Sequence, residues 1–538
     1  MTIFQLLKKE YDKPLGKLLI LTGVSGMSSA GVIALINSAA QNSSAGKFTF
    51  SSLLMFVAVV GIFITSQKFI LTEGIVVIEQ ILHNIRVRLS DKIRRTDLLN
   101  IEIIGKSEIY NRLTQETSLI SQTAAFLITA LQSAVLLVFI IAYIAYLSIT
   151  AAILLVVLTG LGVLVFQKNN RKIMAELIET NKAEIKYFDS LTDIIDGLKE
   201  IKLNRKKGND LFSYYTDISN HVQKLKVKTG SSFSVNMVFS QAFIYIILGA
   251  IVFVIPQVSE GFSKEIISTT TAMLFAVGPL NSLVSMIPYY EKVNLAVTNI
   301  YNLEGELDKE LNLFEVQPIN GENRFTGFNS IELNSLYFEY YNRESDESFS
   351  IGPINLTIKK GETIFLIGGN GSGKTTLLKA LTMLYKPKSG NIFVDNKIVD
   401  DNNYLEYREL YSAIFYDFHL FNKLYGLENI DPRRINELLK LMQIDSKTEY
   451  REDHFTKLNL STGQRKRLAM IVTFLEDKPI YIFDEWAADQ DPQFKNYFYE
   501  ELLKKLKAEG KTVIAVSHDD RYFSLADRVI KMDYGKIV

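Results

Sequence analysis

Asp484 and Glu485 are two adjacent carboxylates that follow the apolar run "PIYIF" at residues 479–483. Apolar runs of this length, rich in β-branched and aromatic residues, predict a buried strand. Side-by-side carboxylates at the tip of a buried strand are costly unless a cation and a water molecule use them. Trp486, the only tryptophan in the chain, follows directly. The pair therefore raises the question of which cation, which water and which reaction it serves.

A glycine-rich loop earlier in the chain answers part of this question. "TIFLI" (363–367) predicts a strand, "TLLKAL" (376–381) predicts a helix, and "GGNGSGKT" (368–375) lies between them. This is the strand–loop–helix context that the phosphate-binding loop requires. Its backbone N–H groups turn towards the β-phosphate, Lys374 reaches the β- and γ-phosphates, and the Thr375 hydroxyl binds Mg²⁺. The residues predicted to hold ATP here are Gly368, Gly369, Asn370, Gly371, Ser372, Gly373, Lys374, Thr375 and Thr376.

Four more stretches accompany the loop in a fixed order. They are "LSTGQRKRLAM" from Leu460, "PIYIFDE" (479–485), "DQD" (489–491) and "TVIAVSH" (512–518), the last of which predicts a strand that ends in His518. Their order and spacing resemble the nucleotide-binding domain of ABC transporters, and the resemblance covers residues 331–538. It implies an α/β P-loop domain that hydrolyses ATP.

The resemblance also assigns the acids. It implies that Asp484 holds Mg²⁺ through water and that Glu485 is the general base that orients and activates the attacking water. Two acids are needed because metal binding and proton abstraction are separate tasks. By the same resemblance His518 contacts the γ-phosphate, and Asp491 contacts the opposite subunit.

The signature stretch bears on assembly. Ser461, Thr462, Gly463 and Gln464 match the family signature that closes over the γ-phosphate of the other subunit's ATP, with threonine where most members have glycine. Taken alone, the stretch also fits a helix N-cap at Ser461. The chain has one P-loop and one signature, and in this family each ATP site takes them from different subunits. The resemblance therefore implies a homodimer with two composite sites.

Two aromatic positions need separate treatment. Tyr340 in "LYFEYY" matches the residue that stacks on adenine, with Tyr341 as its rival and a strand-edge tyrosine as the alternative for both. "AIFYDFHLF" (413–421) aligns with the family's Q-loop and places Tyr416 where glutamine normally lies. A tyrosine cannot replace that amide towards Mg²⁺, so Asp417 or a water molecule is expected to substitute.

One branch of the ABC transporter family resembles this sequence more than the others do. "FDEWAADQDP" (483–492), "GGNGSGKTT" and "SHDDRYF" together resemble the cyclic peptide exporters, a branch with exporters of pyoverdine, syringomycin and lasso-peptide microcins. Members are half-transporters of the bacterial inner membrane. The resemblance implies a peptide-like cargo: a siderophore precursor, a lipopeptide or a lasso peptide.

The first half of the chain predicts membrane spans. A spanning helix needs about 20 mostly apolar residues, and long uncharged runs fill this half; buried core helices of a large soluble domain are the alternative. The expected architecture is a six-helix transmembrane domain of the ABC exporter type (1–310), a linker (311–330) and the α/β nucleotide-binding domain (331–538). The six spans are predicted at 18–40, 48–70, 120–146, 148–167, 233–257 and 266–289.

Positive charge sets the orientation. Four lysines precede the first span, and the 68–116 and 168–228 connections hold eight and thirteen Lys or Arg. The other three connections hold Lys47, none and Lys264. The positive-inside rule therefore places both termini and both long connections in the cytoplasm. Helices are expected to extend below the bilayer, with turns at "GKSEIY" (105–110) and "NRKKGNDLF" (204–212).

The charge balance and the lack of cysteine exclude some classes of function. With 59 Lys+Arg and 59 Asp+Glu, the neutral chain does not suit nucleic-acid binding by counterion release. The absence of cysteine excludes disulfides and thiolate metal sites. An ATP-driven exporter is predicted; the alternatives are a flippase for a lipid or lipopeptide and a non-transporting regulatory ATPase, which intact Glu485 and His518 disfavour. Polar groups inside the spans are expected mainly to join helices: Gln122, Gln132, Asn236, Gln241, Asn281, Tyr143 and Tyr245.

Overall fold

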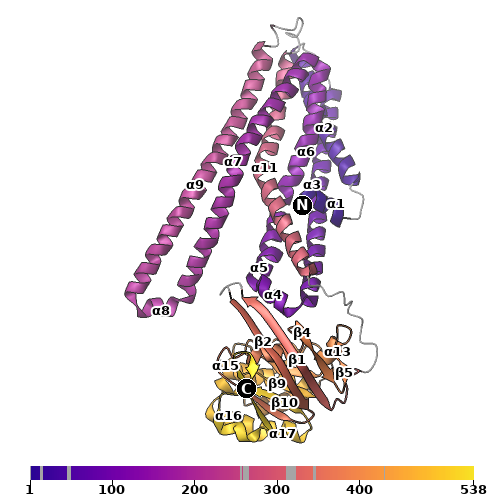
Figure 1. Cartoon of the computed structure of the whole chain (residues 1–538). Coiled ribbons are helices and arrows are strands. Elements are labelled where there is room, and N and C mark those ends of the chain that lie inside the picture. The colour runs from indigo at the N-terminus through magenta and orange to yellow at the C-terminus, as the bar shows by residue number, and fades with distance from the viewer. Residues whose placement is uncertain are drawn as a thin grey trace. The chain divides into compact units, whose positions relative to one another are not determined.

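The computed structural model describes residues 2–11, 16–44, 50–254, 257, 266–309, 323–342, 347–428 and 430–538 (Figure 1). The chain divides into two compact units. The first comprises Met1–Ser90 and Ile109–Glu304, and the second comprises Asp91–Glu108 and Gly305–Val538. A short piece of the N-terminal half therefore folds with the C-terminal half. Most of the predicted linker (311–330) lies outside the described residues, namely residues 311–322.

The described residues of the first unit form helices and the short breaks between them. Backbone polar groups in a bilayer must bond within their own segment, and helices achieve this. The helices are α1 (Ile3–Glu10), α2 (Gly16–Ser44), α3 (Phe50–Arg95), α5 (Lys106–Asn111), η1 (Arg112–Glu116), α6 (Thr117–Leu147), α7 (Ile149–Asp196), α8 (Leu198–Leu203), α9 (Arg205–Gly249), η2 (Ala250–Val254) and α11 (Ile266–Lys309).

Five helices of the described chain are long and apolar enough to cross a membrane: Gly16–Ala39, Phe50–Arg95, Lys106–Leu147, Arg205–Val254 and Ile267–Lys309. The predicted fourth span falls in α7, whose apolar stretch Ile149–Gly162 is shorter. The count of six spans therefore stays a prediction.

Several long helices extend well past their apolar segments, as predicted. α7 has 48 residues and α9 has 45. At about 1.5 Å per residue such a helix is about 70 Å long, more than twice the hydrocarbon thickness of about 30 Å.

The turns between helices are shorter than predicted. α6 and α7 are separated only by Ser148, whose hydroxyl accepts from the Ala151 N–H and caps α7. The stretches 105–110 and 204–212 are mostly helical, which corrects the expected turns. The breaks fall at Gly105, which has a φ of +90°, and at Asn204, which caps α9.

Polar side chains join helices of the first unit at two predicted positions. The Gln67 side chain on α3 donates to Gln132 Oε1 on α6 at 3.1 Å, and Asn37 Nδ2 on α2 donates to the Tyr143 hydroxyl on α6 at 3.2 Å. Gln122 instead bonds within its own helix. For Asn236, Gln241, Asn281 and Tyr245 the role stays a prediction.

The described residues of the second unit form two large sheets and a two-stranded sheet of β7 (Tyr450–Arg451) and β8 (His454–Phe455). The six-stranded sheet has the order β12-β11-β3-β10-β9-β6, and its strands are parallel except for β12. Its strands are β3 (Thr363–Ile367), β6 (Tyr411–Ile414), β9 (Ile480–Phe483), β10 (Thr512–Val516), β11 (Arg528–Asp533) and β12 (Lys536–Ile537). The antiparallel sheet has the order β2-β1-β4-β5, from β1 (Ser330–Asn342), β2 (Glu347–Lys359), β4 (Ser389–Val394) and β5 (Lys397–Ile398).

Helices and turns connect these strands. The helices of this unit are α4 (Leu98–Ile104), α12 (Lys374–Leu381), α13 (Tyr404–Arg408), α14 (Pro432–Leu441), α15 (Thr462–Glu476), η4 (Trp486–Asp489), α16 (Pro492–Tyr497), η5 (Phe498–Leu502), α17 (Leu503–Ala508) and η6 (Asp520–Leu525). Parallel neighbours end at one edge of a sheet, where α/β proteins bind ligands. The fold thus brings together the segments that follow β3, β6, β9 and β10.

Candidate active site

A cavity of about 670 Å³ opens at this edge of the second unit. Its size suits a nucleotide, since pockets for small molecules span roughly 300–1,000 Å³. It is lined by Tyr340, Phe349, Asn370, Gly371, Ser372, Gly373, Lys374, Thr375, Thr376, Lys379, Tyr416, Asp417 and Glu485. Most of the predicted P-loop residues are therefore on its wall.

The P-loop has the backbone that its glycines permit. Gly368 has a φ of +148°, and a Cβ there would lie 2.2 Å from the Met532 carbonyl oxygen, so only glycine fits. The buried Lys374 ammonium donates to the carbonyls of Gly368 at 3.0 Å and Gly369 at 2.9 Å. These bonds hold one positive charge beside the N-terminus of α12, where a phosphate is favoured.

Asp484 is buried beside the P-loop. Its Oδ2 accepts from the Thr375 hydroxyl at 2.8 Å, whereas its Oδ1 has no hydrogen-bond partner among the described residues. Burial raises the pKa of the Asp484 carboxyl, and the Thr375 hydroxyl opposes that rise. An unsatisfied carboxylate oxygen next to a hydroxyl fits a hard divalent cation, which takes oxygen ligands. The two residues thus fit the expected Mg²⁺.

Glu485 and His518 are brought together by adjacent strands. Their segments follow β9 and β10, which pair in parallel with Phe483 opposite Ala515. The Nε2 of His518 lies 3.1 Å from Oε1 of Glu485. Glu485 has a φ of +51°, which is uncommon for a residue with a side chain. The predicted general base and the predicted γ-phosphate contact therefore form one hydrogen-bonded pair.

The tyrosine alternatives are separated by strand alternation. Tyr340 lines the cavity and packs beside Phe349, with ring centroids 5.9 Å apart. Tyr341 points the other way because successive side chains alternate along a strand, and it is 52% exposed. The arrangement favours Tyr340 for the adenine ring.

The signature residues do not line this cavity. Ser461 accepts from the Gln464 N–H, and the Gln464 side chain accepts from the Ser461 N–H in return, so the N-cap interpretation is confirmed. A Cβ at Gly463 would lie 2.5 Å from the Asp489 carbonyl oxygen, so the turn after Glu485 packs directly on the start of α15. The signature is thus held by the loop that carries Glu485, the predicted general base.

Asp491 has local partners. It accepts from the Phe494 N–H at 3.0 Å and pairs with Arg467, and these interactions, the N–H first, lower the pKa of its carboxyl. It caps α16 within its own chain. Contact with an opposite subunit remains an expectation.

Tyr416 follows β6 and also lines the cavity. The side chain is 65% exposed, and its ring centroid lies 5.8 Å from the Lys466 ammonium. Asp417, beside it, lines the same wall. The ring thus faces a cation of α15.

Sequence reasoning missed a polar cluster within the second unit. Glu102 on α4 pairs with Lys379 on α12 at 3.0 Å and accepts from the Tyr385 hydroxyl. Lys379 lines the cavity, and the Tyr385 ring lies 6.4 Å from that of Tyr340. Leu98 of α4 packs against the same core. A pattern of charge in one segment could not reveal a partner 277 residues away.

Comparisons with known proteins cover both units. A family described as "ABC transporter" matches residues 351–488, and one described as "ABC transporter transmembrane region" matches residues 18–280. The "ATP-binding protein SyrD" of Pseudomonas syringae pv. syringae is 33% identical over 96% of this chain and 93% of its own length. The chain belongs to the ABC transporter family. It is an ATP-driven exporter with a multi-pass membrane domain followed by an ATPase domain.

Other ABC transporters differ more in sequence. The "ATP-dependent lipid A-core flippase" of Burkholderia orbicola is 23% identical over 85% of this chain and 78% of its own length. A solved "bacterial Atm1-family ABC exporter with ATP bound" superposes with a TM-score of 0.76 over 97% of this chain and 94% of that chain, at 17% identity. That structure confirms the expected exporter fold.

Replacing Asp484 by asparagine should stabilise the nucleotide-free protein and abolish Mg²⁺-dependent ATP hydrolysis. Burial raises the pKa of this carboxyl in the folded state, so its ionisation destabilises the fold above that pKa. The gain in melting temperature should therefore shrink as the pH falls through the raised pKa. Thermal unfolding of the native protein and of Asp484→Asn without nucleotide, from neutral to acidic pH, measures this difference in melting temperature.

Asp527→Asn is the matched control of opposite sign. Lys507 and the Thr363 N–H lower the pKa of the Asp527 carboxyl, so its replacement should lower the melting temperature at neutral pH. If Asp484→Asn also melted below the native protein, the carboxylate would be satisfied in the fold, contrary to this prediction.

Tyr416→Phe should retain ATPase activity within about twofold, a barrier change of about 0.4 kcal/mol. The ring, which faces Lys466, is preserved, and a neutral phenol oxygen is a poor ligand for Mg²⁺. Steady-state turnover of Tyr416→Phe beside Tyr416→Ala, which removes the ring, is the measurement. A loss of tenfold or more in the phenylalanine variant would show that the hydroxyl is required.

Proposed function

We propose that this ABC transporter exports a cyclic or otherwise compact peptide, such as a siderophore precursor, a lipopeptide or a lasso peptide, across the bacterial inner membrane. Both termini lie in the cytoplasm, residues 1–310 form the membrane domain, and residues 331–538 form the ATPase. Besides the branch-specific stretch at 483–492, the observation that carries the cargo proposal is a preformed apolar cavity in the first unit.

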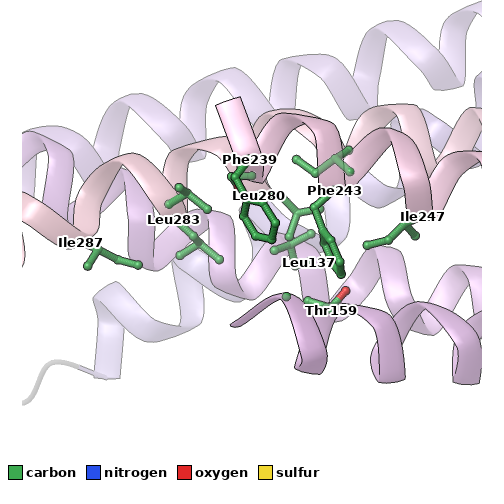
Figure 2. Close-up of a pocket in the computed structure, with 12 residues that line it drawn as sticks. Leu137, Thr159, Phe239, Phe243, Ile247, Leu280, Leu283 and Ile287 are labelled. Carbon is green, nitrogen blue, oxygen red and sulfur yellow. The ribbon is translucent and has the colours of Figure 1, made fainter. Parts of the chain in front are cut away.

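The cavity has a volume of about 250 Å³ and lies among α6, α7, α9 and α11 (Figure 2). Phe239 and Phe243 lie beside each other on its wall, with ring centroids 6.0 Å apart. Two hydroxyl groups are the polar side-chain groups in the wall. It is lined by Leu137, Thr159, Gly162, Phe239, Ser240, Phe243, Ile244, Ile247, Leu280, Leu283, Val284 and Ile287.

The volume indicates what part of a cargo fits. An apolar cavity of about 150 Å³ holds benzene, whereas whole drug-sized ligands need roughly 300–1,000 Å³. A cavity of about 250 Å³ therefore suits one aromatic or aliphatic group, or a short acyl segment, of a larger molecule. A compact peptide that places such a group here loses less conformational entropy on binding than a flexible linear peptide.

The proposed hydrolysis uses the residues at the sheet edge. Mg²⁺, held by Thr375 and Asp484, would neutralise charge on the phosphates. Lys374 would bind the β- and γ-phosphates, and Glu485 would take the proton of the attacking water. His518, which shares a hydrogen bond with Glu485, would contact the γ-phosphate.

We propose a homodimer with two composite sites. Ser461 to Gln464 do not line their own chain's cavity, and the half-exposed Asp491 lies on the same loop as the signature contacts. This supports a signature that completes the site of a second copy.

A lipid flippase is the second candidate. It is favoured by the similarity, over 85% of this chain, to a protein named as a lipid A-core flippase. The apolar cavity would equally take an acyl chain. The two functions therefore differ in the polar part of the cargo that must cross the membrane, a peptide or a lipid headgroup.

Heterodimers test the composite sites. A Lys374→Ala chain paired with a Ser461→Arg chain should hydrolyse ATP, because in trans one site keeps both native elements. A native chain paired with a Lys374→Ala, Ser461→Arg double variant should be inactive, because both sites are then damaged. Differently tagged chains purified by tandem affinity provide the samples. The reverse pattern of activity would place each complete site within one chain.

Cargo is tested in proteoliposomes. ATPase activity should be stimulated by a cyclic peptide more than by its linearised form or by lipid, and inside-out vesicles should accumulate the cyclic peptide. Glu485→Gln is the hydrolysis-deficient control. Ser240→Leu, which fills the apolar cavity, should raise the peptide concentration needed for stimulation without changing basal ATPase activity. Stimulation by lipid alone, with no peptide accumulation, would favour the flippase.

A further inference from the structure

Lys466, on the first turns of α15, is a lysine with almost no solvent contact: it is 1% exposed. A buried ammonium is costly unless anions or carbonyl oxygens surround it. Neither the motif assignments nor the proposed hydrolysis uses this residue. Its burial within the ATPase domain therefore calls for a specific set of partners.

Two of those partners belong to the loop that carries Glu485, the proposed general base, and the third is the Tyr416 ring. The Lys466 ammonium donates to the Glu485 backbone carbonyl at 2.7 Å and pairs with Asp489 Oδ2 at 2.6 Å. The Tyr416 ring centroid lies 5.8 Å from the same ammonium. One side chain thus joins α15, the Glu485 peptide, η4 and the loop after β6.

Trp486 completes a reciprocal pair. Its indole Nε1 donates to the Lys466 carbonyl at 2.9 Å, while the Lys466 side chain bonds the carbonyl that immediately precedes Trp486. The indole is buried and packs on Phe498 with ring centroids 4.5 Å apart. The only tryptophan therefore anchors the loop after β9 to the α15 backbone, and the lysine side chain holds the Glu485 carbonyl of that loop.

These hydrogen bonds hold a residue whose backbone conformation is unfavourable. Glu485 has a φ of +51°, in the left-handed region that residues with a Cβ seldom adopt. A charged donor on its carbonyl stabilises that conformation, since hydrogen bonds to charged groups are stronger than neutral ones. In this conformation the Glu485 carboxylate lies 3.1 Å from His518 Nε2 and on the wall of the nucleotide cavity.

We propose that Lys466 is a positioning residue for ATP hydrolysis. Its ammonium, held by Asp489, fixes the left-handed backbone that aims the Glu485 carboxylate into the cavity, and it contacts neither nucleotide nor water. The proposal rests on the proposed role of Glu485. The Tyr416 ring, which faces the same ammonium, makes the loop after β6 part of this arrangement.

The test compares Lys466→Met with a matched lysine of the same domain. Lys511 pairs with Asp477 at 2.7 Å, donates to the Asp477 carbonyl at 3.3 Å, and lies 6.0 Å from the Tyr481 ring centroid, but it is remote from the cavity-lining residues in sequence and is not one of them. Lys466→Met should lower kcat for ATP by about tenfold or more while KM and nucleotide affinity stay within about twofold. Lys511→Met should leave kcat unchanged.

A double-mutant cycle separates positioning from a general loss of structure. In a Glu485→Gln background, Lys466→Met should lower the residual turnover no further, because its effect passes through the Glu485 carboxylate. Lys466→Arg should restore part of kcat, since a guanidinium also donates to a carbonyl and pairs with a carboxylate. Equal additional losses in both backgrounds, or a native kcat in Lys466→Met, would overturn the proposal.

Two further variants keep the test decisive if Lys466→Met does not fold. Asp489→Asn removes the negative charge of the ion pair while keeping the shape of the side chain, and Trp486→Phe removes the indole N–H that bonds the Lys466 carbonyl. Both should lower kcat more than KM. If both retained native kcat, the proposal would fail. If Glu485→Gln itself kept native turnover, the proposed general base would be wrong, and that result would be distinct from a failure of Lys466 alone.

Discussion

The ATPase domain is organised around the burial of one negative charge. Asp484 lies at the end of a central parallel strand, 1% exposed, with one oxygen on the Thr375 hydroxyl and the other unsatisfied among the described residues. A carboxylate is tolerated there only if the loop after β3 lies against the end of β9. The strand order β3-β10-β9-β6 meets this requirement and brings His518 from β10 between them. The cavity follows from that order.

A second charged group, the Lys466–Asp489 ion pair, holds the residue that follows Asp484. Behind the cavity wall, Lys466 and Asp489 form an ion pair that is buried on the lysine side and 40% exposed on the aspartate side. Such pairs contribute little to stability on average, because desolvation offsets the Coulomb attraction. Their value here lies in geometry, since the ammonium also bonds the Glu485 peptide. Tyr416, predicted to stand where the family has the Q-loop glutamine, faces this same ammonium.

Local sequence patterns predicted the parts of the site that follow strands. The P-loop, Asp484, Glu485 and His518 each come directly after an apolar run, so parallel pairing alone brings them to one edge. The exporter fold was expected from the resemblance to ABC transporters together with the predicted spans, and the N-cap from a serine that precedes a predicted helix. Such reasoning could not find Glu102 beside Lys379, or Lys466 beside Asp489, because side-chain partners on separate elements leave no periodic signal. It placed turns over 105–110 and 204–212 where single residues, Gly105 and Asn204, break the helices.

The inclusion of Asp91–Glu108 in the second unit has an evolutionary consequence. Lys379 is 9% exposed, and Glu102, its carboxylate partner, belongs to the N-terminal half of the sequence. An ATPase domain taken from a relative would leave the charge of Glu102 unmatched unless it carried an equivalent lysine and tyrosine. An exchange of the two halves of this chain at the linker would therefore separate the Glu102–Lys379 pair. In this chain, an exchanged ATPase domain would have to bring α4 with it to keep Glu102 beside Lys379.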